Sequence, residues 1–186
     1  PYQWLVKERI GVESHFVESP DRVYVDPDLF EAAVDGRTAI VATSRVCYTS
    51  GYIQDIRAVA DIAHKHGACI LVDDYQGTGQ IPMNVVAQDV DILVTGALKW
   101  LMGGPGLAFV YIREGLLPTL QPTIAGWFGH RDQFEFKARE FAFRDDARRI
   151  ELGTPAMAAV YAANGGLDIV QEVSVESICE RTRYLT

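Results

Sequence analysis

The sequence predicts an α/β fold built on a mainly parallel sheet with flanking helices. Residues 38–43 and 68–72 are continuous apolar runs of strand length, as expected for strands that are covered on both faces. Between them, residues 55–66 repeat apolar side chains at helical spacing and are closed by Gly67. A strand, a helix and a second strand in this order form a right-handed crossover between parallel neighbours. The chain is therefore expected to hold parallel strands joined by helices.

Boundary signals place the other elements in chain order. Residues 22–25 form a short apolar strand candidate. Asp26 then offers an N-cap with Pro27 at the first helical position, and Gly36 is expected to end this helix. Three further elements follow from apolar patterns, namely strands at 90–94 and 107–112 and a helix at 155–170. This order of elements is typical of one α/β domain.

Composition and charge exclude several classes of function. The 186 residues are 48% hydrophobic and 23% charged, which is ordinary for a globular domain. The formal charge of -8 and the pI of about 4.9 argue against a nucleic-acid partner, because such surfaces collect Lys and Arg in excess. No apolar run approaches the length of a membrane span. We expect a cytoplasmic protein that binds neither nucleic acid nor membrane.

The cysteine and histidine positions suggest no metal site and no disulfide framework. Cys47, Cys69 and Cys179 are odd in number, widely spaced and not in CxxC pairs. Cys69 lies in an apolar strand and is expected to be inert. His64 and His66 lie two apart on a predicted helix, where they do not share a face. We therefore expect no metal ligands.

Reactive residues follow three of the predicted strands. In open α/β sheets, ligands gather outside the carboxyl ends of the strands. The segments at 44–51, 73–76 and 96–100 each come directly after a strand. They place Asp73 and Lys99 on the same side of the sheet.

Asp73 and Lys99 together suit pyridoxal phosphate chemistry. The cofactor is an electron sink only while its ring nitrogen is protonated, and a nearby carboxylate stabilises that charge. A lysine must lose its proton to act as a nucleophile, which an apolar setting favours. Alone, a strand-terminal Asp or a single Lys is more often structural. A nucleotide-binding domain is a weaker alternative, because no GxGxxG follows a strand.

The surroundings of these two residues resemble a known family. VDDYQ at 72–76, DVDILV at 89–94, and Lys99 followed by GGPG at 103–106 resemble the class V aminotransferase branch of the fold type I pyridoxal-phosphate enzymes. That branch contains cysteine desulfurases, kynureninases and several aminotransferases. The resemblance covers about residues 25–170. It implies the large domain of an aspartate aminotransferase-like fold, with pyridoxal 5'-phosphate as cofactor.

The resemblance implies a role for each matching residue. Lys99 would form the Schiff base with the cofactor and would be the catalytic residue. Asp73 would pair with the pyridine nitrogen, and Gln76 would hydrogen-bond the phenolate oxygen. The family works as homodimers on small amino-acid substrates, so both are expected here.

The second half of the chain is similar to kynureninases. AGWFGH at 125–130 and LGTP at 152–155 resemble segments that follow the lysine in that group. Trp127 would lie near the cofactor or substrate, and Thr154 would reach the cofactor phosphate of a neighbouring subunit. The alternatives are that Trp127 is a core residue and that Thr154 is the N-cap of the helix after it.

Two positions depart from the family pattern. Kynureninases usually carry Tyr just before the lysine, and cysteine desulfurases carry His there and Ser two residues further upstream, whereas this chain has Leu98 and Gly96. Thr95 is the substitute phosphate ligand that the sequence offers, one place out of register. Gln76 stands where kynureninases usually have His and fits desulfurases or aminotransferases better.

The sequence therefore predicts an enzyme that acts on an amino acid through Lys99, with a kynureninase-like C–C lyase as one reading. An aminotransferase or a cysteine desulfurase-like enzyme is the alternative. A relative without catalysis that serves as a binding or assembly module is the rival class. Because the chain starts at Pro1 without Met and stops at Thr186 inside a charged helix, we expect a piece of a longer protein. Residues 1–172 would be part of the large domain, and residues 173–186 would begin the connection to a small C-terminal domain.

Overall fold

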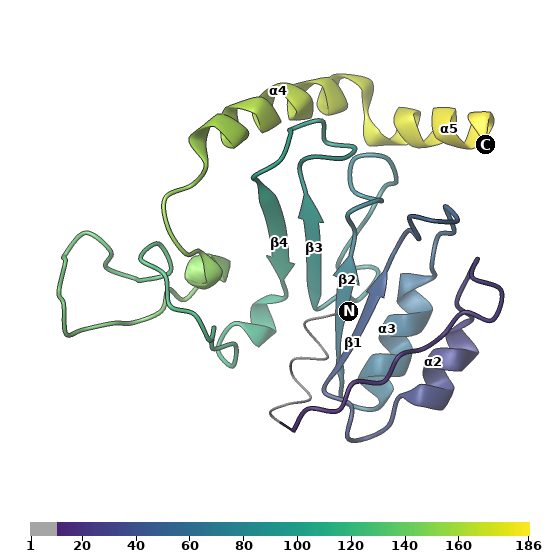
Figure 1. Cartoon of the computed structure of the whole chain (residues 1–186), viewed down its shortest axis with the longest axis horizontal. Coiled ribbons are helices and arrows are strands. Elements are labelled where there is room, and N and C mark those ends of the chain that lie inside the picture. The colour runs from purple at the N-terminus through teal and green to yellow at the C-terminus, as the bar shows by residue number, and fades with distance from the viewer. Residues whose placement is uncertain (1–10) are drawn as a thin grey trace.

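A computed structural model describes residues 11–186 of the chain (Figure 1), so the expectation about its start at Pro1 lies outside the described residues. The sheet holds four strands, β1 (Ile40–Ser44), β2 (Cys69–Asp73), β3 (Ile92–Gly96) and β4 (Ala108–Ile112). The helices are α2 (Pro27–Ala33), α3 (Ile56–Lys65), α4 (Met157–Val173) and α5 (Val175–Leu185), with short 3-10 helices η1 (Glu114–Leu116) and η2 (Ala147–Ile150). The predicted α/β class is confirmed.

The sheet has the order β1-β2-β3-β4, with three parallel strands and one antiparallel strand. Asp73 is paired with Ser44 on one side and with Val94 on the other. The carboxyl ends of β1, β2 and β3 therefore lie along one edge, which we call the carboxyl edge. In Figure 1 this edge points toward α4.

Aspartate caps begin both helices that cover the sheet. Asp26 accepts a hydrogen bond from the Asp28 backbone at 3.0 Å and starts α2, and Asp55 accepts one from the Ala58 backbone at 3.0 Å and starts α3. Each carboxylate satisfies a backbone N–H that has no partner inside its helix. The predicted cap at Asp26 is confirmed.

Helices α2 and α3 bury one face of the sheet. The core on this side consists of sheet residues Val41, Ile70, Val72 and Leu93 packed with helix residues Phe30, Ile56, Val59, Ala60 and Ala63. Removing these side chains from water is the main driving force for this packing.

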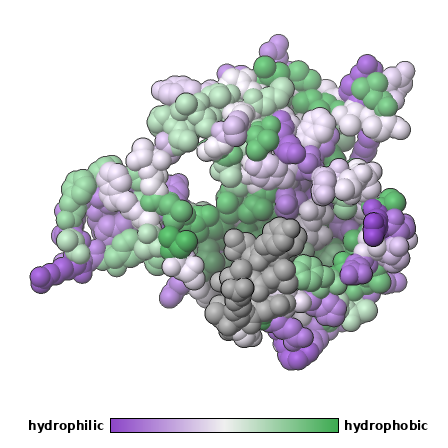
Figure 2. Space-filling model, in the orientation of Figure 1, coloured by the Kyte–Doolittle hydropathy of each residue, from purple (hydrophilic) through white to green (hydrophobic). Residues whose placement is uncertain are grey.

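The opposite face of the sheet is half exposed. Ile40, Cys69, Leu71 and Val94 are each partly accessible, and Val110 is 37% exposed. Figure 2 shows hydrophobic residues gathered below α4, over the position of β4 in Figure 1. Partial burial raises the pKa of the Cys69 thiol, which lowers its reactivity, as expected from the sequence.

Local hydrogen bonds replace the strand that was predicted at residues 22–25. This prediction is wrong, because the segment forms a bend and irregular backbone instead. The Asp21 carboxylate accepts hydrogen bonds from the backbones of Val23 at 2.8 Å and Tyr24 at 3.3 Å, and the Ser19 hydroxyl donates to the Tyr24 carbonyl. These contacts turn the chain back on itself and use the groups that a strand would pair.

Two helix boundaries also differ from the prediction. Helix α2 ends at Ala33, three residues before the predicted end at Gly36, and Val34 is its C-cap. Helix α4 begins at Met157 with Ala156 as its N-cap, so Thr154 is not the cap. Ser174, at a φ of 71°, separates α4 from α5, and the domain boundary predicted near residue 172 stays a prediction.

An ionic network ties α3 to the amino end of β3 and the end of β4. His64 Nε2 lies 2.8 Å from Asp91 Oδ2, and His64 Nδ1 lies 3.1 Å from Asp89 Oδ2. Arg113 donates to Asp89 at 2.5 Å and pairs with Asp91 at 3.0 Å. This end of β3 is opposite to the carboxyl edge, so His64 has a structural role in the fold.

Within residues 11–186, no helix is long and apolar enough to cross a membrane. The same stretch brings no group of three His, Cys, Asp or Glu side chains close enough to hold a metal ion.

Candidate active site

Asp73 ends β2 and is exposed at the carboxyl edge. Its Oδ1 accepts a hydrogen bond from the Tyr75 backbone at 2.9 Å, which holds the carboxylate at the first turn after the strand. Its pairing with Ser44 and Val94 places it at the centre of the three parallel strands. An anionic group at this point can stabilise a protonated ring nitrogen of a ligand.

Lys99 lies in a tight turn, three residues beyond the end of β3. The Met102 backbone donates to the Lys99 carbonyl at 3.1 Å, and the Gly103 backbone donates to the Ala97 carbonyl at 2.7 Å. The side chain of Lys99 is exposed. Since β2 and β3 are parallel neighbours, their ends bring Asp73 and Lys99 to the same edge of the sheet.

Helix α4 packs directly on the turn that carries Lys99. A Cβ atom added at Gly166 would lie 2.1 Å from the Leu101 carbonyl oxygen, and one added at Gly103 would lie 2.8 Å from the Cα of Ala163. Only glycine permits this approach of helix and turn. The position of Lys99 is therefore fixed from β3 on one side and from α4 on the other.

A buried ion pair fixes the turn that follows Asp73. Arg45 donates from Nε to Asp74 Oδ1 at 2.5 Å and from Nη2 to Asp74 Oδ2 at 2.8 Å, and both side chains are almost fully buried. The guanidinium also donates to the carbonyls of Ile81 and Pro82, at 3.0 and 2.9 Å. Thr78 donates to Asp74 Oδ2 at 2.5 Å. The pair thus links the loop after β1 to both ends of the 74–82 turn.

Sequence reasoning missed this pair. In the sequence, Asp74 belongs to the VDDYQ pattern and Arg45 to the 44–51 segment after a predicted strand, and neither pattern links the two. The signal that could have found it is an Asp and an Arg directly after two neighbouring parallel strands, where each charge needs a partner.

Gln76 lies in the connection after β2, and Thr95 lies within β3 but is turned away from Asp73. Gln76 follows Asp73 within the 74–82 turn, and its carbonyl accepts a hydrogen bond from the Gln80 side chain. Thr95 is 4% exposed, and its hydroxyl points to the Asp74 carbonyl oxygen at 3.4 Å. Because side chains alternate along a strand, Thr95 is on the face opposite to Val94, the partner of Asp73.

Trp127 and Thr154 lie away from this group, in the long segment between η1 and α4. Trp127 donates from Nε1 to the Gln133 carbonyl at 2.6 Å and packs edge-on against Phe128 and Phe134. Trp127 is 43% exposed, so it is not a core residue. Thr154 is exposed in the stretch before α4. In Figure 1 this segment extends outward beyond β4. Their predicted contacts with the cofactor stay predictions.

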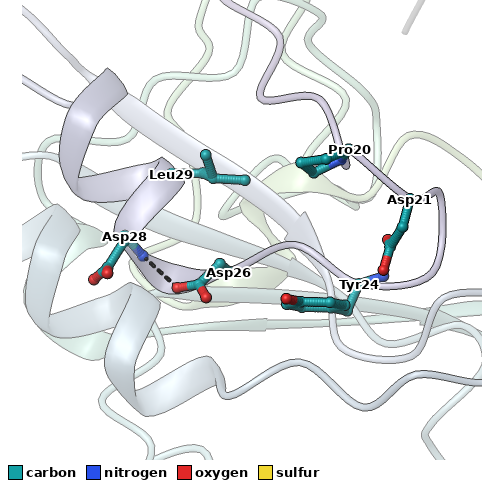
Figure 3. A pocket seen from close by; sticks show the side chains of 6 residues that line it. All are labelled: Pro20, Asp21, Tyr24, Asp26, Asp28 and Leu29. Carbon is teal, nitrogen blue, oxygen red and sulfur yellow. Dashed lines mark hydrogen bonds between the residues drawn. The ribbon is translucent and has the colours of Figure 1, made fainter.

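A cavity of about 350 Å³ lies elsewhere, between the 19–26 segment and α2 (Figure 3). It is lined by Pro20, Asp21, Tyr24, Asp26, Asp28 and Leu29. The carboxylates of Asp21 and Asp26 accept hydrogen bonds from nearby backbone N–H groups, as Asp26 does from Asp28 in Figure 3. It contains neither Asp73 nor Lys99.

The family model described as "Aminotransferase class-V" matches residues 3–186. The chain belongs to the class V aminotransferase family.

Relatives of this class V chain include an aminotransferase and kynureninases. It is 36% identical over 156 residues to an uncharacterized aminotransferase of Bacillus subtilis (strain 168), covering 84% of the chain and 41% of the relative. It is 29% identical over 166 residues to the kynureninase of Pseudomonas fluorescens, covering 89% of the chain and 40% of the relative. The chain thus spans about 40% of the length of these two relatives.

Solved structures agree with the fold. The apo cysteine desulfurase of Thermococcus onnurineus NA1 matches with a TM-score of 0.79 and 25% identity, over 94% of the chain and 44% of the desulfurase. A variant of the lyase C-DES, with glycine covalently linked to its pyridoxal phosphate, matches with a TM-score of 0.83 and 19% identity, over 97% of the chain and 49% of the lyase. Class V aminotransferases are pyridoxal 5'-phosphate enzymes, and this is the cofactor of the chain's family.

The side chains at the carboxyl edge fit this cofactor. A carboxylate ends β2 and a primary amine lies just past β3, which are the two groups that a protonated ring nitrogen and an aldehyde require. The predictions of family, fold and cofactor are confirmed.

Proposed function

We propose that the chain is the cofactor-binding part of an enzyme that converts a small amino acid, with Lys99 as the covalent attachment point for pyridoxal 5'-phosphate. One observation carries the proposal. The strands β2 and β3 are parallel neighbours, β2 ends at Asp73, and Lys99 follows the end of β3 by three residues. Bound cofactor supplies an electron sink for the carbanion that forms at the substrate.

The chain's own residues would orient the ring and move the proton. Asp73 would hold the ring nitrogen in its protonated state, and the 2.9 Å hydrogen bond from Tyr75 keeps that carboxylate in place. Lys99, once displaced by a substrate amine, would accept a proton at Nζ and return it. The packing of α4 on the Lys99 turn would hold the backbone from which that amine projects.

Kynureninase-like C–C cleavage is one candidate reaction. The AGWFGH and LGTP segments and the similarity to kynureninases support it. Transamination is the second candidate, supported by the 36% identical Bacillus subtilis relative and by Gln76. We further propose that the protein is a homodimer, as its resemblance to the fold type I enzymes implies. We also propose a cytoplasmic location, because its three cysteines are free thiols, as in proteins of a reducing compartment.

Borohydride trapping tests the proposal directly. The complete protein would be mixed with pyridoxal 5'-phosphate, reduced with borohydride, digested and analysed by mass spectrometry. The cofactor mass is expected on the peptide with Lys99 and is expected to vanish in Lys99→Ala. Lys137→Ala, an exposed lysine paired with Glu135, is the control and should label as the unaltered protein does.

Labelling that persists in Lys99→Ala would contradict the assignment of Lys99. A protein that takes up no cofactor at all would favour the non-catalytic binding module. Turnover of kynurenine, alanine and cysteine by the complete protein loaded with pyridoxal 5'-phosphate, without borohydride, then separates lyase, aminotransferase and desulfurase.

A further inference from the structure

The buried glycine at the end of β3 leaves a space that a tyrosine fills. Gly96 has no side chain, and a Cβ atom added to it would lie 2.0 Å from Tyr75 Oη and 2.2 Å from Tyr75 Cζ. The Tyr75 phenol therefore occupies the position where a side chain at residue 96 would stand. It crosses from the connection after β2 to the end of β3.

This position is on the same face of the sheet as the Asp73 carboxylate. Asp73 is paired with Val94, and Gly96 is two residues further along β3 and so points to the same side. Lys99 is three residues beyond Gly96. The Tyr75 hydroxyl thus lies at the carboxyl edge, where the ends of β2 and β3 present the two groups assigned to the cofactor.

The hydroxyl of Tyr75 is available as a donor. The hydrogen bond of Tyr75 to Asp73 uses its backbone N–H. Among the described residues, its hydroxyl makes no hydrogen bond, and it is not one of the buried polar atoms that lack a partner. Thr95 has its hydroxyl on the other face, directed at the Asp74 carbonyl, and does not offer a donor on this side.

We propose that Tyr75 binds the phosphate group of pyridoxal 5'-phosphate through its phenol hydroxyl, in the place of a side chain at residue 96. The inference rests on the proposed function. A phosphate dianion needs several donors, and a phenol O–H to a charged acceptor is among the stronger hydrogen bonds. Tyr75 would be a cofactor-binding residue that fixes the phosphate arm relative to Asp73 and Lys99.

Two forms of the cofactor separate a phosphate contact from any other role. The affinity of the complete protein would be measured for pyridoxal 5'-phosphate and for pyridoxal, which lacks the phosphate. Tyr75→Phe keeps the ring that packs on Gly96 and removes the hydroxyl alone. It is expected to weaken pyridoxal 5'-phosphate binding by about tenfold to a hundredfold and pyridoxal binding by less than about twofold. Tyr161→Phe, an exposed tyrosine on α4, is the matched control and should change neither affinity.

Moving the hydroxyl from residue 75 to residue 96 gives a second test of the phosphate contact. Tyr75→Ala should lose phosphate-dependent affinity, and adding Gly96→Ser should restore most of it, because the serine hydroxyl enters the space that the phenol vacates. Gly96→Ser alone should collide with Tyr75 and lower the melting temperature. The phosphorus-31 NMR shift of the bound cofactor should move in Tyr75→Phe and return in the double variant.

Equal losses for both cofactor forms in Tyr75→Phe, or no loss for either, would overturn the assignment of the phosphate contact. A wild-type protein that binds neither form would instead refute the proposed function, and the phosphate contact with it. A wild-type protein that binds both forms with the same affinity would overturn the phosphate contact while leaving the role of Lys99 intact.

Discussion

Arg45 and Asp74 form a two-pronged ion pair in which the side chains are only 5% and 1% exposed. The guanidinium joins the end of β1 to the turn after β2 and also binds the carbonyls of Ile81 and Pro82. Its main effect is to hold the 74–82 turn, which begins directly after Asp73. The candidate site is therefore built on a connection that is rigid on the side of Asp73.

Arg45→Met should be strongly destabilising, because it leaves the Asp74 charge buried without a partner. A loss of about 3–5 kcal/mol in the free energy of unfolding is expected by urea denaturation. Arg37→Met removes an exposed pair with Asp35 and should leave the unfolding midpoint nearly unchanged. A loss in Arg45→Met as small as that of the surface variant would show that the buried pair does not hold the turn.

Two neighbouring glycines in α4 should respond in opposite ways to alanine. Gly165 has open space around its Cβ position, so Gly165→Ala should stabilise the helix by up to about 1 kcal/mol. Gly166→Ala places a methyl group 2.1 Å from the Leu101 carbonyl oxygen, which forces α4 away from the Lys99 turn. It should lower both the melting temperature and the yield of borohydride labelling at Lys99. Similar melting temperatures for the two variants would argue against close packing of α4 on this turn.

Asp73→Asn tests the charge at the end of β2 with little change of shape. The amide oxygen can still accept the hydrogen bond from the Tyr75 backbone, so the melting temperature of the apo protein should hardly move. Loss of the negative charge beside the ring nitrogen should reduce turnover on the order of a hundredfold or more. Covalent labelling at Lys99 should persist. Full activity in Asp73→Asn would assign the ring nitrogen to another residue.

The network around Asp89 predicts a dependence of stability on pH. The hydrogen bond from Arg113 holds the pKa of Asp89 below its ordinary value, with smaller contributions from His64. A carboxyl with a lowered folded-state pKa stabilises the fold at pH values above its unfolded pKa. This contribution is lost as the pH falls through the folded-state pKa. His64 and Arg113 contact this carboxyl, and Asp91 pairs with both of them.

The melting temperature of Asp89→Asn should therefore lie below that of the unaltered protein at neutral pH, and the gap should narrow in strong acid. Asp168→Asn, at an exposed carboxylate on α4, is the matched control and should track the unaltered protein across the titration. A gap that stays constant with pH would mean that Asp89 acts through packing and not through its charge.

Periodicity was sufficient for the sheet and its helices, and it failed where short-range hydrogen bonds decide the backbone. Apolar runs placed β1, β2 and β3 to within two residues, because buried parallel strands have a strong sequence signal. The 22–25 segment has strand-forming residues, yet its backbone N–H groups at Val23 and Tyr24 donate to the Asp21 carboxylate. The start of α4 was misplaced because Thr154 and Pro155 look like a cap, although the cap is Ala156.

In the candidate site, too, some residues could be found from the sequence and others required the fold. Asp73 and Lys99 could be found from the sequence because each follows a strand, and the parallel order alone brings strand ends together. Thr95 could be placed near them, but the face to which it points depends on the register of β3. The contact between Tyr75 and Gly96 required the fold, because no spacing rule states which side chain fills the space beside a glycine.

The half-exposed face of the sheet matters for handling the protein. Ile40, Leu71 and Val94 give this face an apolar surface, and the outer strand β4 adds Val110, which is 37% exposed. Flat apolar strands at a sheet margin are sites of aggregation. The 186-residue chain on its own should be prone to self-association at high concentration. Dilute samples, or a charged substitution at Val110, should keep it monodisperse during spectroscopy.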